Sequence, residues 1–256
     1  MDELIALLGR NWRLLLLYPG GLAALVALLL ARLLLEDRRN LRRGAERLRG
    51  REIIIAAAWL LTIALLPLPQ TGWPYALDLL VLLALIELPH WTSIISTPDR
   101  APDEIAAQLA PLLNVYPLLA LSIALLGQAA GSLVVHEINR SGGWLHWLGI
   151  VGWASTLPPL LGLGPWRDRY TLGTLSALRR VAHMGLLLAA ALPAHNETPT
   201  VMALEGFACL LLPLAALDRW WRGRSEWWIG WQPWLVVAFA LVAASTSGAV
   251  LLARLR

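Results

Sequence analysis

The sequence predicts an all-α integral membrane protein, a polytopic bundle of about eight transmembrane helices that occupies residues 1–256 as a single domain. Hydrophobic residues make up 58% of the chain and charged residues only 15%, whereas soluble domains carry roughly a quarter charged residues. The apolar residues form long continuous runs, and a run of about 20 of them can cross the bilayer core as a helix. Because lipid cannot satisfy backbone polar groups, such runs must close their hydrogen bonds internally, which favours helices.

The predicted spans follow the longest apolar runs. Short polar connections separate them, so neighbouring helices are expected to cross the membrane in opposite directions. We predict spans at residues 14–35, 53–68, 75–95, 105–128, 144–163, 175–194, 200–217 and 231–252.

Arginine residues orient these spans, because basic residues concentrate in cytoplasmic connections. They gather in alternate connections, which places those connections in the cytoplasm and both termini on the non-cytoplasmic side of the cell (plasma) membrane. The segment 36–52 is predicted to be a basic cytoplasmic surface helix, and the Trp- and Arg-rich segment 218–230 an interfacial loop. We expect the connections to bind a partner protein or anionic lipid through Arg38, Arg39, Arg42, Arg43, Arg100, Arg167, Arg169, Arg179 and Arg180.

Four ionisable residues inside predicted spans are the candidate functional residues. Asp78, Glu87 and His90 share the third span, and Glu205 lies in the seventh. Glu87 and His90 are three residues apart and therefore lie on one helix face. Ionisable groups at this depth are costly and often belong to proton relays. We interpret the four residues either as a buried proton path or as structural contacts.

Known catalytic and metal-binding motifs are absent from the sequence. No Gly-rich phosphate loop, Gly-x-Ser-x-Gly or Cys-x-x-Cys is present, and His136-Glu137 lacks the second histidine of a zinc-protease helix. His183, in the sixth span, is interpreted as a core residue. We therefore expect no catalytic residue, no metal and no cofactor in this chain. Because the arginines lie beside spans, nucleic acid is not an expected partner.

Part of the sequence resembles the NuoH-type membrane subunit of respiratory complex I and its relatives in energy-converting hydrogenases. The resemblance runs through 56–68, 78–85, 106–109, 120–126, 130–133 and 136–138. It implies eight spans with external termini, and a subunit of a multisubunit oxidoreductase that links the cytoplasmic electron-transfer arm to the membrane arm. It further implies iron–sulfur clusters in partner subunits and a quinone nearby. The family's acidic quinone-lining cluster is missing, because its place is taken by Ser-Thr-Leu-Pro-Pro-Leu at 155–160.

Two other functions remain open at this point. A stand-alone transporter is favoured by prolines that interrupt spans, such as Pro89, Pro111 and Pro117, since broken helices build midplane binding sites. A membrane enzyme acting on lipids would need clustered acids at the cytoplasmic interface. Asp99, Asp103 and Glu104 are the candidates for that cluster. The first expectation remains a non-catalytic subunit that contributes to proton translocation.

Overall fold

A computed structural model describes residues 50–65, 77–95, 101–163, 173–191 and 199–221, together with residues 26, 28, 29, 31, 237, 238, 240, 241 and 245. This part of the chain is helical, and its only β-type pairing is an isolated bridge between Asp78 and Val134. The predicted all-α class is therefore confirmed. The helices are α4 (Gly50–Leu65), α5 (Leu79–Ile95), α6 (Pro102–Ala130), α7 (Val135–Arg140), α8 (Trp144–Leu160), α9 (Gly173–Ala191) and α10 (Pro199–Trp221).

Helices lie at the six predicted spans that the structure describes, from the second to the seventh. The predicted spans 14–35 and 231–252 fall almost wholly outside the described residues, as do positions 36–49 of the basic segment. One boundary is corrected. The segment predicted as a loop from residue 218 begins inside α10, which continues to Trp221, and Asp218 is fully buried there.

Helix α6 shows how local sequence sets the helix ends. It begins with Pro102, whose fixed φ suits a first turn, and Asp103 and Glu104 follow where the helix dipole favours acids. It ends at Ala130 and is followed by the capping residue Gly131, which has a left-handed φ of 70° that glycine adopts without strain. Among the described helices, α6 alone is long and apolar enough to cross a membrane by length and composition. The eight-span arrangement therefore still rests on the sequence.

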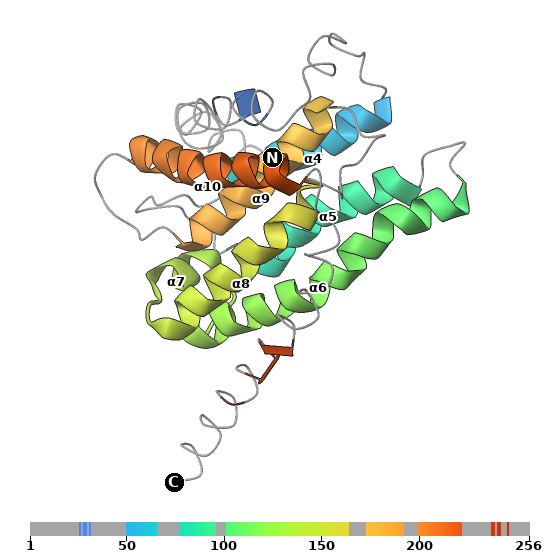
Figure 1. Ribbon diagram of the computed structural model, residues 1–256. Coiled ribbons are helices and arrows are strands. Elements are labelled where there is room, and N and C mark those ends of the chain that lie inside the picture. The colour runs from blue at the N-terminus through green and yellow to red at the C-terminus, as the bar shows by residue number, and fades with distance from the viewer. Residues whose placement is uncertain are drawn as a thin grey trace, which may run out of the picture.

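Helix α9 is the central element of the bundle. It contacts α4, α5, α7, α8 and α10 (Figure 1), and its residues from 177 to 190 are all buried. Helix α6 packs along α8 instead, where Gly149 lets the two backbones approach each other closely. Any charged side chain on α9 is thereby carried into the core.

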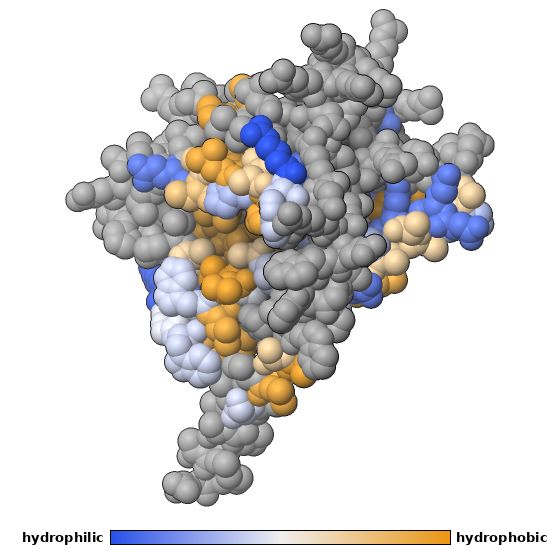
Figure 2. All heavy atoms as spheres, in the orientation of Figure 1, coloured by the Kyte–Doolittle hydropathy of each residue, from blue (hydrophilic) through white to orange (hydrophobic). Residues whose placement is uncertain are grey.

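Large apolar side chains also cover the outer faces of the bundle. Exposed examples come from four helices: Ile54 on α4, Leu88 on α5, Val151 on α8 and Leu212 on α10. Figure 2 shows apolar residues gathered on one face of the molecule. Contiguous apolar surface on a protein is usually covered by a partner or by lipid.

Candidate functional site

A buried carboxylate, Glu87 on α5, is the centre of the candidate site. Arg179 reaches across from α9 and places its Nη2 2.9 Å from Oε1 and 3.1 Å from Oε2 of Glu87. The Nε2 atom of His183, also on α9, lies 2.5 Å from Oε1. Two basic side chains from one helix therefore converge on one acid from another.

The spacing of the α9 residues explains this convergence. Arg179 and His183 are four residues apart, so both side chains project from the same face of the helix. Arg179 is 6% exposed and His183 is fully buried. A buried arginine is strongly unfavourable without an anion, and Glu87 supplies that anion. The sequence of α9 thus requires an acid on the facing helix.

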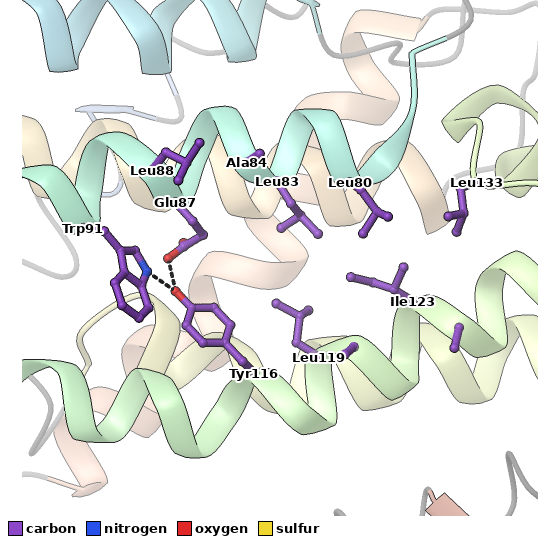
Figure 3. A pocket seen from close by; sticks show the side chains of 12 residues that line it. Leu80, Leu83, Ala84, Glu87, Leu88, Trp91, Tyr116, Leu119, Ile123 and Leu133 are labelled. Atoms are coloured by element: carbon purple, nitrogen blue, oxygen red, sulfur yellow. Dashed lines mark hydrogen bonds between the residues drawn. The ribbon is translucent and has the colours of Figure 1, made fainter.

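Tyr116 on α6 and Trp91 on α5 complete the cluster. The Tyr116 hydroxyl donates to Glu87 Oε2 at 2.5 Å and accepts from Trp91 Nε1 at 2.6 Å (Figure 3). The Trp91 and Tyr116 rings stack with centroids 5.7 Å apart. Three helices, α5, α6 and α9, therefore meet at one carboxylate. We call Glu87, Trp91, Tyr116, Arg179 and His183 the Glu87 cluster.

The hydrogen bonds of the cluster determine its chemistry. Each carboxylate oxygen has two partners, since Arg179 and His183 share Oε1 while Arg179 and Tyr116 share Oε2. Within the described residues, His183 Nδ1 is buried without a hydrogen-bond partner. Histidine is the side-chain type in this cluster that exchanges a proton most readily. The arrangement can therefore hold Glu87 ionised and pass a proton along the His183–Glu87 bond.

A cavity of about 540 Å³ opens between α5 and α6 beside the cluster. Glu87, Trp91 and Tyr116 line one end, and Leu80 and Leu133 line the other (Figure 3). Its walls are almost entirely apolar. The polar atoms of the cluster point at one another across its end and leave little polar surface for a ligand.

The structure brings together only some of the predicted proton-path residues. Glu87 and His90 are both buried and lie one turn apart on α5. Asp78 caps the start of that helix, where its Oδ1 accepts the Leu80 backbone N–H at 2.7 Å. Glu205 is exposed on α10. Within the described residues, no hydrogen bond or ion pair joins Asp78 or Glu205 to Glu87.

Arg179 and Arg180 require a correction. We expect them, from the charge pattern, on a cytoplasmic connection that binds a partner. The structure instead places both inside α9, where both are buried. Arg179 binds Glu87, and Arg180 Nε donates to the Leu161 carbonyl at 3.0 Å. Neither side chain is available on a surface. The other candidate docking residues, Arg38, Arg39, Arg42, Arg43, Arg100, Arg167 and Arg169, lie outside the described residues.

Four members of the cluster, Trp91, Tyr116, Arg179 and His183, are not predicted from the sequence as part of a buried site. The interpretation of His183 as a core residue captures its burial but not its bond to Glu87. Tyr116 is one tyrosine in an apolar helix and carries no distinctive signal. The spacing of Arg179 and His183, two basic residues on one face of an apolar segment, was an available signal. It indicates a buried partner acid more directly than a cytoplasmic connection.

Comparisons with known proteins leave the family open. No model of a known protein family matches the chain, and no curated protein matches it either. Among the described residues, no group of three or more His, Cys, Asp or Glu side chains could hold a metal ion. The Glu87 cluster therefore remains the main indication of function among the described residues.

Proposed function

We propose that this chain is a multi-pass subunit of the plasma membrane that belongs to a complex I-related oxidoreductase and contributes to proton translocation through the Glu87 cluster. It links a cytoplasmic electron-transfer arm to the membrane arm. Iron–sulfur clusters belong to the partner subunits, and a quinone binds nearby rather than serving as a cofactor of this chain. The chain itself is non-catalytic.

The observation that supports this proposal is the convergence of Glu87, Arg179, His183 and Tyr116 inside an apolar bundle. Burying two or three ionisable groups costs several kcal/mol per ion before their attraction offsets it. A helix bundle in lipid rarely keeps such groups unless they serve an ion or proton pathway. The cluster joins three helices at a single carboxylate, which suits a site whose proton occupancy changes the helix packing.

Each residue of the Glu87 cluster has its own role in the proposed proton path. Arg179 supplies a fixed positive charge that holds the Glu87 carboxylate in place. His183 is the group that exchanges a proton with Glu87 across their hydrogen bond. Tyr116 donates a hydrogen bond to the second carboxylate oxygen at the end of the apolar cavity that both residues line. His90, one turn further along α5, lies on the same face as Glu87 and provides a second imidazole for the path.

Purification from the native membrane tests the proposed assembly. We expect iron–sulfur or hydrogenase-like subunits to co-purify with the chain, bound partly through the arginines of the connections. Recovery of the chain alone would reject the proposal. In the intact assembly, Glu87→Gln is expected to impair proton-coupled turnover without loss of assembly. Normal turnover in that variant would assign Glu87 to structure.

A stand-alone transporter is the second candidate function. It is supported by the cavity beside Glu87 and by prolines inside the helices that line it, Pro89 in α5 and Pro111 and Pro117 in α6. Prolines remove backbone hydrogen bonds and loosen helices near midplane sites. The chain purified alone and placed in vesicles would then move a solute, whereas the subunit proposal expects no transport by the isolated chain.

A further inference from the structure

We propose that the cavity between α5 and α6 binds one hydrocarbon chain of a membrane lipid, which shields the Glu87 cluster from water. The cavity of about 540 Å³ falls within the range of roughly 300–1,000 Å³ that is usual for small-molecule sites. This inference rests on the proposed membrane location. It does not depend on the partner subunits or on proton transfer.

Three alanines create the hollow. Ala84 on α5 and Ala120 and Ala124 on α6 line the cavity, where larger side chains would fill the space between the helices. The two helices touch over only a short stretch, so the space is not closed by direct packing. The close-up in Figure 3 shows leucine and isoleucine side chains from both helices facing this space.

The chemistry of the walls excludes a polar occupant. Apart from Glu87, Trp91 and Tyr116 at one end, the cavity is lined by Leu, Ile and Ala side chains. The three polar side chains already bond to one another or to α9. Water needs two to four polar partners to be stable in a cavity, and apolar cavities of this kind stay dry or take an apolar guest.

The length of the cavity matches one leaflet of a bilayer. The lining runs along α5 from Leu80 to Trp91, which is about 16 Å of helix at 1.5 Å per residue. One leaflet contributes about 15 Å to a hydrocarbon core of about 30 Å. The cavity therefore extends from the N-terminal end of α5, the non-cytoplasmic end in the proposed topology, past Glu87 to Trp91. A lipid chain from that leaflet has the right length and polarity.

A hydrocarbon chain can reach the cavity from the side. The opening continues into exposed apolar surface, since the lining residues Leu80 and Leu88 are 49% and 65% exposed. A chain can thus enter sideways from the surrounding lipid.

Photolabelling in nanodiscs tests this site. The probe is phosphatidylcholine with a diazirine at the middle of one acyl chain, and labelled residues are mapped by mass spectrometry. We expect labels on cavity residues of α5 and α6 in the unmodified chain. These labels should be lost in Ala120→Phe and Ala124→Phe, whose rings fill the cavity. They should persist in Ala110→Phe, an exposed position on the same helix that does not line the cavity.

Two further observations keep the test decisive. Labels on the exposed face of α10 around Leu212 should be equal in all variants, which shows that each is folded and inserted. If both α6 variants fail this check, Ala84→Leu fills the cavity from α5 and replaces them.

Equal labelling of the cavity residues in filled and unfilled variants would indicate ordinary surrounding lipid and overturn the inference. Absence of label there in the unmodified chain would mean that another polypeptide segment covers the site, and would also overturn it. Neither result affects the co-purification test of the proposed function.

Discussion

The guanidinium of Arg179 contacts both carboxylate oxygens of Glu87, although the two residues are 92 positions apart in the sequence. This ion pair joins the central helix α9 to α5. Both side chains are buried, so solvent screens their attraction poorly and each residue depends on the other for a counter-charge. The pair is therefore the contact whose disruption should have the largest effect on the bundle.

Removing one member of this pair should destabilise the protein strongly. In Arg179→Met the Glu87 carboxylate stays buried without its fixed cation, and we expect the free energy of unfolding to fall by about 3–5 kcal/mol. Denaturant titration of the purified protein in detergent measures this change.

The double variant Glu87→Leu/Arg179→Met is the matched control. Replacing both members of a buried pair with apolar residues is often close to neutral, so part of the lost stability should return, although the Tyr116 hydroxyl and His183 Nε2 lose their partner on Glu87. If the loss of stability in the double variant equals the sum of the losses in Glu87→Leu and Arg179→Met, the two residues do not act as a pair.

The Tyr116 hydroxyl should contribute a smaller but measurable amount. Tyr116→Phe removes the donor to Glu87 and leaves Trp91 Nε1 without its acceptor. Both hydrogen bonds are part-buried, so we expect the unfolding free energy to fall by about 1 kcal/mol, the usual net value of one hydrogen bond. Adding Trp91→Phe removes the stranded N–H group, and a double-mutant cycle should then show coupling between the two residues. Strict additivity would contradict the hydrogen bond between them.

The sequence predicts the helices well because each apolar run is continuous and is bounded by polar or proline-containing connections. Six predicted spans correspond to described helices, with small shifts at their ends. The burial of Glu87 and His90 also follows from their positions within an apolar run. These features depend only on residues that are close in sequence.

The partners of Glu87 could not be predicted in the same way. Its bonds to Tyr116, Arg179 and His183 span 29, 92 and 96 positions, and they depend on which helix faces which in the folded bundle. The charge pattern misplaces Arg179 and Arg180 because it counts every arginine as part of a connection. Arg179 is buried and lies four residues before the buried His183, so it does not belong to a connection. Which helices face each other in the folded bundle decides whether an arginine is buried or exposed.

The close contact between α6 and α8 should depend on Gly149. A Cβ atom at this position would lie 2.9 Å from the Ser122 carbonyl oxygen and 2.7 Å from Leu126 Cγ. The carbonyl belongs to the α6 backbone and cannot move aside easily, so Gly149→Ala should push the helices apart. Overpacking of this kind costs about 1–3 kcal/mol, which thermal unfolding would detect.

Gly142→Ala is the control for this substitution. A Cβ atom there meets nothing within 4 Å, so the melting temperature should remain close to that of the unmodified protein. Equal destabilisation by both substitutions would point to a general effect of removing glycine, and unchanged stability in Gly149→Ala would show that the α6–α8 contact relaxes freely.

A proton role and a structural role for His183 can be separated with His183→Gln. The glutamine side chain can still donate a hydrogen bond to Glu87 Oε1, as His183 Nε2 does, but it cannot take up a proton near neutral pH. We expect its unfolding free energy to stay within about 1 kcal/mol of the original, the scale of one net hydrogen bond. Proton-coupled turnover of the assembly should nevertheless fall by on the order of 100-fold, the lower end of what a positioned acid or base contributes.

His183→Leu removes the donor as well, and should lose both stability and turnover. If His183→Gln keeps full turnover, then His183 only positions Glu87. The proton must then reach the Glu87 carboxylate through another group, and His90 is the imidazole on the same face of α5.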